Sequence, residues 1–449
     1  TPAVAGGFWN VDQTPTGYAR GATGFVEAGD PSAVYLNPAA LVANPGFQWL
    51  IGGNMYWDEH TFERAPDSIN EYGSEEKYSP SKNLAKTPPP FSPHLMFSYN
   101  FAELGAEKFS MGLGIWGPPR SDHIYDEEGP QRYGSVYELH MQIHYGLAFA
   151  YEFDWKKLRL GITAVSVSQV IDAALKLNTQ GPEGVPLCPS PGDVACDIFT
   201  EVKAEHHYIP NAILGFSLEL FENLTLGGSY QLPYDASPEG KVKLQLGENL
   251  ADAASFEGDE VTVKVKMAPL VRFALRYDDP ERGLDVEFAA VWEGWSRSDS
   301  IIFQTNNIQV VTKIGEEQTL PLENIRLEPH WNDSFSLRLG GSYQAIEDLL
   351  LVRFGTFYDK AAVDDEYLHT GTFDLDKVAL TGGVRIELPW DHWIDLTGGY
   401  SHWLSKTITN SKVALVDSLT QQELGIVGNG TYKASHIVFM LGIGGKLSI

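Results

Sequence analysis

Two cysteines are the side chains of this sequence best suited to covalent chemistry, and they stand close together. Cys188 and Cys196 are eight residues apart in the stretch PLCPSPGDVACD, among prolines and a glycine that are typical of a loop. In an exported protein we expect them to form a disulfide, which would contribute roughly 2–3 kcal/mol by restricting the loop. The alternative is a pair of free thiols. No other ligands cluster there, so we expect neither a metal site nor a cofactor.

Two histidines offer a second kind of chemistry. His140 and His144 would share one face of a strand, where either could serve as a general base. A hydrolase would also need a serine beside the base and a polar group that orients it. No G-x-S-x-G turn or similar nucleophile signal accompanies these histidines. We therefore expect that the protein is not an enzyme.

Arginines at alternate positions of strand-like stretches form a third set of candidates. A guanidinium group can hold a carboxylate through paired hydrogen bonds. Alternation places five arginines on the inner side of a closed sheet: Arg272, Arg276, Arg338, Arg353 and Arg385. Acidic residues of the same parity would neutralise several of them: Asp285, Glu287, Glu293 and Glu387. We take Arg272, Arg338 and Arg353 as candidate ligand-binding residues, with structural ion pairs as the alternative.

Alternation of apolar and polar residues identifies the elements that must position these side chains. The stretch LDVEFAAVWE at 284–293 is one example. A period of two predicts β-strands, and it appears in fourteen candidate strands: 46–62, 91–103, 108–117, 133–153, 157–177, 206–221, 224–235, 259–277, 283–298, 326–345, 349–360, 373–388, 393–410 and 431–447. An even number of such strands is typical of a bacterial transmembrane barrel.

The connections between these strands give the second signal for a barrel. Six are short and seven are long: 104–107, 154–156, 222–223, 278–282, 346–348 and 389–392, against 63–90, 118–132, 178–205, 236–258, 299–325, 361–372 and 411–430. The two kinds alternate strictly, as periplasmic turns and extracellular loops do in outer-membrane barrels. A soluble sandwich would mix loop lengths at both ends. We therefore predict an all-β fold, a 14-stranded antiparallel transmembrane β-barrel.

Composition agrees with this prediction. The 449 residues include 22 Phe, 20 Tyr and 11 Trp, which suit interfacial aromatic belts, and no apolar run is long enough for a transmembrane helix. The formal net charge of −27 argues against nucleic acid as a partner. Acidic stretches such as 63–90 and 361–372 predict a solvated outer surface, without the ligand spacing of a calcium loop. Because the chain starts at Thr1 without a leader, we expect an exported protein whose signal peptide has been removed.

The first 45 residues lack sustained alternation. They are rich in Gly, Ala and Pro, and they are too few to form a stable domain of their own. Within a barrel protein such a segment is best housed in the lumen. We therefore predict two parts, an N-terminal hatch over residues 1–45 and a barrel with long extracellular loops over residues 46–449.

Part of this segment resembles a known family. The stretch GYARGATGFVEAGDPSAVYLNPAAL at 17–41 is similar to the hatch of the FadL/TodX family, outer-membrane transporters of long-chain fatty acids and hydrophobic compounds. The shared pattern is a run of small residues, an acidic residue and then Asn-Pro-Ala: Gly21, Ala22, Gly24, Asp30, Asn37, Pro38 and Ala39. Hairpins of the family resemble 206–235, 284–297, 332–359 and 380–403. The chain departs from many outer-membrane barrels because it ends in Ser448-Ile449 and not in an aromatic residue.

The resemblance implies a function as well as a fold. The expected activity is passive uptake of long-chain fatty acids or hydrocarbons, with ligand bound first among the extracellular loops and then beside the hatch. The hatch would shift, and the ligand would leave sideways through the barrel wall. We expect a monomer in the bacterial outer membrane, in contact with outer-membrane lipid and lipopolysaccharide. An adhesin or a general porin-like barrel is the alternative, although a plug argues against an open porin.

The predicted hinge of the hatch is Asn37, Pro38 and Ala39. Pro38 has no N–H to donate and holds Asn37 extended, while the small Ala39 would let this bend repack. The alternative is a tight turn in a static plug. The resemblance also places a lateral opening near the third strand, where glycines would weaken pairing, with an ordinary strand end as the alternative: Gly112, Gly114 and Gly117.

Apolar residues of the hatch are candidates for the ligand pocket: Phe8, Trp9, Phe25, Val34, Tyr35 and Leu36. A pocket of this kind binds each CH₂ group with about 0.8 kcal/mol. The alternative is that these side chains only pack the plug against the wall. The fatty-acid transporters of the family carry a lysine before the strand that here begins near Phe335, and this chain has His330 and Asn332 instead. That departure favours a neutral hydrocarbon over a carboxylate.

Overall fold

A closed β-barrel is the main body of the protein. The structure is a computed structural model that describes residues 14–65, 81–82, 91–117, 122–180, 187–188, 190–313 and 317–447. Fourteen antiparallel strands form the barrel: β1 (Phe47–Arg64), β3 (Ser92–Phe101), β4 (Ala106–Trp116), β6 (Tyr137–Phe153), β7 (Leu158–Asn178), β8 (Asp197–Phe221), β9 (Leu224–Gln231), β14 (Leu270–Asp279), β15 (Leu284–Glu293), β20 (Ser334–Ile346), β21 (Leu350–Asp359), β22 (Lys377–Leu388), β23 (His392–Trp403) and β27 (Gly430–Leu447). Each pairs with the next, and β27 closes the ring on β1. The predicted fold class is confirmed.

Alternation separates the two faces of the wall. On β20, Phe335, Leu337 and Leu339 are exposed on the outside, whereas Ser336 and Arg338 between them are buried. An exposed apolar row costs free energy in water and is favourable against hydrocarbon. The outer face of the barrel is therefore a membrane-facing surface.

Several predicted strands are broken in the structure, and proline explains three of the breaks. The stretch 259–277 forms β13 (Glu260–Met267) and β14, separated by Pro269. The stretch 224–235 forms β9 and β10 (Tyr234–Ala236), separated by Pro233, and 326–345 keeps only β20 because β19 (Ile325–Leu327) ends before Pro329. Proline has no N–H for the ladder. The stretch 393–410 is likewise divided into β23 and β24 (Lys406–Ile408), and β8 begins at Asp197, earlier than predicted.

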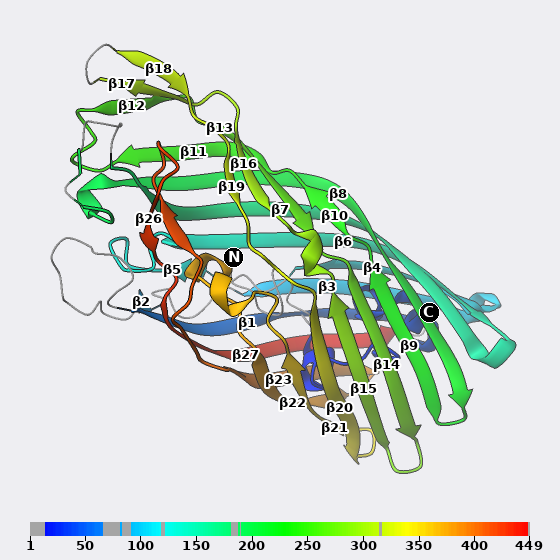
Figure 1. Ribbon diagram of the computed structural model, residues 1–449. Helices are drawn as coiled ribbons and strands as arrows, with labels where there is room; N and C mark the ends of the chain where they lie inside the picture. Colours follow the sequence, from blue (N-terminus) through cyan, green and yellow to red (C-terminus); the bar gives the residue numbers. More distant parts are fainter. Residues whose placement is uncertain are drawn as a thin grey trace.

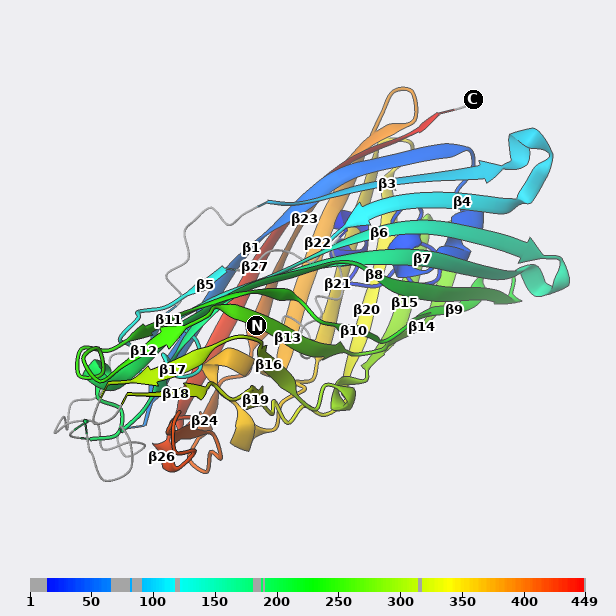
Figure 2. The ribbon, with the colours of Figure 1, turned by 90° about the horizontal axis from the view of Figure 1, so that it is seen from above.

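The remaining strands lie at the end of the barrel where the long connections are, opposite the short turns (Figures 1 and 2). We call β10, β19, β24 and the following strands the hood: β2 (Ser81–Lys82), β5 (Asp122–Ile124), β11 (Glu239–Leu246), β12 (Ala254–Glu257), β13, β16 (Ile301–Thr305), β17 (Gln309–Thr312), β18 (Gln318–Pro321), β25 (Ala414–Val416) and β26 (Glu423–Ile426). Strands β12, β17 and β18 form a separate sheet. Long connections are extracellular in outer-membrane barrels, so the hood faces outward from the cell.

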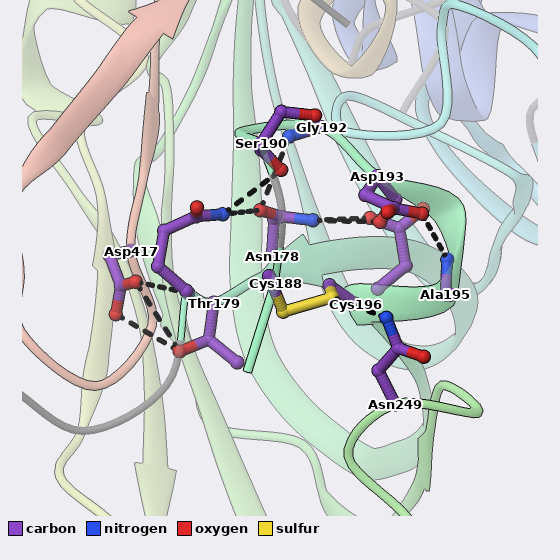
Figure 3. The surroundings of a disulfide bond; sticks show 12 residues. Asn178, Thr179, Cys188, Ser190, Gly192, Asp193, Ala195, Cys196, Asn249 and Asp417 are labelled. Carbon is purple, nitrogen blue, oxygen red and sulfur yellow. Dashed lines mark hydrogen bonds between the residues drawn. A yellow bond between two sulfur atoms is a disulfide. The ribbon is translucent and has the colours of Figure 1, made fainter. Parts of the chain in front are cut away.

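A disulfide between Cys188 and Cys196 lies in the hood, with the two Cα atoms 6.1 Å apart. Figure 3 shows the polar residues around it. Asn178 donates a hydrogen bond to the backbone oxygen of Asp193 at 3.3 Å, and Thr179 donates to the Asp417 carboxylate at 3.2 Å. Since Asp417 belongs to the connection before β27, these bonds hold together loops that are far apart in sequence.

Residues 14–46 lie inside the barrel (blue in Figures 1 and 2), and we call them the N-terminal segment. The segment contains α1 (Pro15–Ala19), α2 (Ala33–Leu36) and the 3-10 helix η1 (Pro38–Ala43). Helix α1 contacts β21, β22 and β23, whereas η1 contacts β6, β7 and β8 on another part of the wall. None of the helices in the described part of the chain is long and apolar enough to cross a membrane. The other helices are single turns: η2 (Ala102–Leu104), η3 (Trp155–Lys157), η4 (Val194–Cys196), η5 (Trp295–Arg297), η6 (Asp365–Tyr367) and η7 (Thr370–Thr372).

Candidate functional site

Glycines on two parts of the wall make room for the N-terminal segment. Gly161 and Gly215 are partners across β7 and β8, and a Cβ atom at Gly215 would collide with the Asn37 side chain. On β20, a Cβ atom at Gly340 would collide with the backbone oxygen of Arg20. Only glycine allows the backbone of the segment to approach the wall so closely. The segment is therefore seated in places shaped for it.

The predicted hinge occupies the first of these places. Asn37 is fully buried, and its amide nitrogen donates to the backbone oxygens of Phe25 at 2.6 Å and Phe216 at 2.9 Å. Its side-chain oxygen accepts from the Ala39 N–H at 3.1 Å, while Pro38 begins η1. The turn is thus held both to the segment and to β8. Any movement of the hinge must break these bonds, and its mobility stays a prediction.

Two carboxylates of β15 anchor the segment to the opposite wall. Arg20 forms an ion pair with Asp285, and Glu287 accepts hydrogen bonds from the N–H groups of Gly24 at 2.9 Å and Phe25 at 2.8 Å. The sequence had placed both acids on the inner face. The structure shows that they bind the segment as well as neighbouring arginines, since Arg276 Nε lies 3.7 Å from Asp285.

The three candidate ligand-binding arginines are all buried in the lumen, and they differ in their partners. Arg353 is paired with Asp395, and Arg338 lies 3.5 Å from Asp359. Arg272 donates to the Ser229 hydroxyl at 3.3 Å, and two of its three guanidinium nitrogens have no hydrogen-bond partner among the described residues. Arg272 has no acidic partner in the described part of the chain, and its guanidinium carbon lies 5.0 Å from the centre of the Tyr35 ring.

The apolar candidates of the hatch pack between the segment and the wall. Phe25 lies between Arg272 and Arg338, whose guanidinium carbons are 5.8 and 6.0 Å from its ring. The rings of Tyr35 and Trp116 are 5.7 Å apart. Val34 and Leu36 are fully buried. Phe8 and Trp9 lie outside the described residues. A contact of these residues with ligand stays a prediction.

Two of the three glycines of the predicted lateral opening, Gly112 and Gly114, face the N-terminal segment. A Cβ atom at Gly112 would lie 2.5 Å from Cγ2 of Val34, and one at Gly114 would lie 3.3 Å from Cγ1 of the same residue. A Cβ atom at Gly117 would collide with the backbone of Gln142. Over 110–115, β4 is paired without interruption with β3 on one side and with β6 on the other. An opening here would require those ladders to separate.

A cavity of about 1440 Å³ lies within the hood, above the N-terminal segment. It is larger than the usual pocket for a small ligand, which is roughly 300–1,000 Å³. Most of its wall is apolar, with side chains from β11, β13 and β16: Val242, Leu244, Val261, Val263, Val265, Ile301 and Phe303. None of the ligand-binding residues predicted in the described part of the chain lines it. The cavity can hold a long apolar molecule.

The charged groups around the cavity balance one another. Its described lining includes four basic and four acidic residues: Arg64, Lys176, Arg326 and Lys412, with Glu138, Glu323, Glu328 and Asp417. Three of the cations lie within 3.4 Å of a carboxylate. Burial lowers the pKa of His369, another lining residue, to about 4, so its imidazole is neutral at pH 7. The cavity therefore presents no excess charge to a ligand.

A column of side chains connects the cavity with the N-terminal segment. His140 lines the cavity. Gln142, two residues further along β6, has its Nε2 atom 3.5 Å from Nε2 of His140. His144 is 3.1 Å from Gln142, and its ring stacks on Trp116 with centroids 5.6 Å apart. Trp116 in turn contacts Tyr35 of the segment. Displacement at the cavity floor can thus reach the segment through direct contacts.

Comparison with known proteins identifies the family. Residues 1–442 match the family model described as "Outer membrane protein transport protein (OMPP1/FadL/TodX)". The chain belongs to this family. The resemblance seen in the sequence is thereby confirmed, and the protein is a member of a family of outer-membrane transport proteins. A search of curated protein sequences finds no significant match.

Solved structures of the FadL/TodX family share the fold at low sequence identity. A FadL homologue from Pseudomonas aeruginosa has a TM-score of 0.78 and 15% identity, with 98% of this chain and 100% of that one covered. The toluene transporters TbuX of Ralstonia pickettii and TodX of P. putida have TM-scores of 0.65 and 0.67 and 16% identity each, with the same coverage. At this identity the likeness concerns the barrel fold alone.

Apart from His140 and His330, the residues that line the cavity were not among those singled out from the sequence of this FadL/TodX member. The alternation of Val261, Val263 and Val265 with polar residues was visible, and it did mark an inward-facing strand. The sequence did not show where this strand lies along the barrel axis. It lies in the hood above the membrane-facing wall, beyond Pro269, and alternation alone does not show that.

Proposed function

We propose that the protein carries hydrophobic compounds, long-chain fatty acids or hydrocarbons, passively across the outer membrane. The observation that carries this proposal is the apolar, charge-balanced cavity above a lumen that the N-terminal segment fills. An open lumen would suit polar solutes, whereas a filled lumen below an apolar cavity suits a ligand that leaves water. Residues 1–45 act as the hatch in this proposal.

Capture and release follow from the contacts of the segment. Each CH₂ group that leaves water in the cavity contributes about 0.8 kcal/mol, so a long chain binds without a specific polar contact. Ligand at His140 disturbs the column through Gln142, His144 and Trp116 to Tyr35. The hatch then moves at Asn37–Ala39, and the ligand leaves sideways through the wall near β4.

Two features bear on the ligand class. The neutral cavity favours a hydrocarbon, in line with the two similar structures that are toluene transporters. Arg272, buried without an acidic partner among the described residues, offers one place below the cavity for a carboxylate. A fatty acid would therefore bind in two steps, first by its tail in the hood and then by its head at Arg272.

Mass spectrometry of lipids extracted from the purified protein tests the ligand class. Recovery of alkanes, aromatics or fatty acids is the expected result, and recovery of none after growth on these compounds would contradict the proposal. Binding by the Arg272→Met variant separates the two classes. Its affinity for palmitate should fall at least tenfold with hexadecane binding unchanged, and equal losses for both would contradict a carboxylate site.

Conductance in planar bilayers tests the hatch. Deletion of residues 1–41 should convert small or absent currents into large steady ones, because the lumen loses its filling. Large steady currents from the intact protein would instead indicate a porin. Unchanged currents after the deletion would show that these residues do not close the pore.

A further inference from the structure

The barrel wall has a break in strand pairing between β8 and β10. Strand β9 pairs with β8 up to Ile213, and β11 takes up the pairing again from Glu205. Between these points β10 still pairs with β13, in the register in which β9 pairs with β14, but no pairing of β10 with β8 exists in the described structure. At about 3.3 Å per residue, the unpaired stretch 206–211 of β8 is roughly 20 Å long. The two strands remain neighbours, and at the lower end of the break the Leu232 N–H donates to the backbone oxygen of Ala212 at 3.0 Å.

Prolines and a strained residue account for the break. Three prolines without N–H donors flank it on the two chains: Pro210 in β8, and Pro233 and Pro238 around β10. Tyr208 has a φ of +62°, which an ordinary strand residue does not adopt. The other edge of β8 is also irregular here, because the register with β7 shifts between Val167 and Gln169. The pairing of β8 with its neighbours on both sides is therefore weakened at the same level along the barrel axis.

Side chains close the break from within. Ile209, Tyr234 and Ala236 are buried there, each no more than 5% exposed. The hydroxyl of Tyr234 donates to the side-chain oxygen of Gln142 at 3.4 Å, so this ring lies across the inner side of the wall. Only single bonds connect the two edges, such as that from the Ser237 N–H to His206 Nδ1 at 3.0 Å. The closure depends on side chains that can rotate.

The break separates the cavity from the outer part of the membrane. On the inside, Val265 lines the cavity and is the strand partner of Ala236, and Gln169 lines it beside the register shift. On the outside, Tyr208 is 80% exposed and Pro210 is also exposed. A strand needs roughly 9–11 residues to cross the apolar core, and the part of β8 from Pro210 to Phe221, with 12 residues, is just long enough. The break therefore begins at the outer edge of the apolar band.

We propose that this break is a lateral portal through which an apolar ligand dissolved in the outer leaflet reaches the cavity without passing through water. The portal rests on the proposed function, uptake of hydrophobic compounds, and is distinct from the exit proposed near β4. Its described edges carry mostly apolar, aromatic and imidazole groups and prolines, and their one carboxylate, Asp235, is paired with Arg297 at 2.7 Å, so the ligand is an uncharged chain or small ring without a large head group. Tyr234 is the residue that opens and closes it.

Crosslinking across the portal tests this proposal in proteoliposomes. His206→Cys combined with Ser237→Cys places two thiols on opposite edges, and an oxidant joins them without disturbing the native disulfide. The probe is tritiated hexadecane, delivered either from the bilayer or from a water-soluble cyclodextrin complex. The locked protein should load at least tenfold more slowly from the bilayer and at an unchanged rate from cyclodextrin.

Matched variants make the result specific. Leu214→Cys with Tyr230→Cys joins partners in the intact β8–β9 ladder and should leave both loading rates unchanged. Tyr234→Ala should accelerate loading from the bilayer alone. Unchanged bilayer loading in both the locked and the Tyr234→Ala proteins would overturn the portal, as would failure of His206→Cys and Ser237→Cys to crosslink. No loading from either source would overturn the proposed function instead.

Discussion

The barrel wall is built in different ways at β4 and at β8. Strand β4 carries Gly112 and Gly114, yet its ladders to β3 and β6 are continuous over 110–115. Strand β8 carries Pro210 opposite the prolines around β10, and there the pairing is lost on one side and shifted on the other. At these two places Gly112 and Gly114 mark a contact with the N-terminal segment, and Pro210 marks a loss of pairing.

The difference follows from backbone chemistry. A glycine keeps its N–H and C=O groups, so the ladder persists and only the side-chain space is freed. At Gly112 that space is taken by Val34. A proline removes the donor itself, and nothing on the neighbouring strand can replace it. The weakest part of the wall is thus expected at β8 rather than at the glycines of β4.

Hydrogen exchange should show the largest contrast between the two regions. Amides of 206–211 lack ladder partners on one side, whereas amides of 110–115 are paired on both edges of β4. We expect exchange on the order of a hundredfold faster in the first region, because local opening there costs less free energy. Mass spectrometry of the protein in nanodiscs measures this directly. Equal protection in both regions would remove the basis of the comparison.

The glycines of β4 can be tested by filling their space. Gly112→Val places methyl groups where Val34 now lies, and we expect a loss of about 3 kcal/mol in the seating of the segment, from overpacking. Ion conductance in planar bilayers should rise as the segment leaves the wall. Gly398→Ala is the control, since the nearest atom to its Cβ would be 3.8 Å away. An unchanged conductance in the Gly112→Val variant would show that this glycine does not seat the segment.

Much of the fold could be read from the sequence because a barrel repeats one simple rule. In β15 and β20 the alternation of apolar and polar residues indicates which face contacts lipid, and the short turns indicate the order of the strands. The break at Pro233 was not anticipated. Alternation continues on both sides of this proline, and only the interrupted ladder to β8, which ends at Ile213 and resumes at Glu205, shows the break.

The candidate site was predicted less completely, for a related reason. Parity placed Arg272, Arg338 and Arg353 in the lumen, where all three are buried. Parity could not show that Asp395 of β23 would neutralise Arg353 of β21, because these strands are not neighbours in the sheet. Nor could it show that Arg272 would meet no described carboxylate. The cavity was missed because its walls combine inner faces of predicted strands, such as Val261 and Val263, with long connections, and alternation does not show how these parts come together in space.

A proline introduced into β4 should weaken the pairing of this strand, as pairing is weakened in β8. Leu113→Pro removes one ladder donor in the middle of the paired stretch, and we expect a loss of about 2 kcal/mol together with faster exchange over 110–115. Loading of hexadecane from the bilayer should then depend less on the β8 portal. Leu113→Ala, which keeps the N–H, is the control. Unchanged protection in the proline variant would show that pairing does not govern the strength of the wall.

Removal of a single hydroxyl should produce the smallest effect and the most local one. Tyr234→Phe keeps the ring across the portal and deletes its hydrogen bond to Gln142. A bond of this kind contributes about 1 kcal/mol, so we expect up to roughly fivefold faster loading of hexadecane from the bilayer. Amides of 206–211 should exchange faster by a similar factor, and those of 110–115 should not change. A change at β4 as well would mean that the hydroxyl stabilises the whole barrel, and that β8 holds no separate gate.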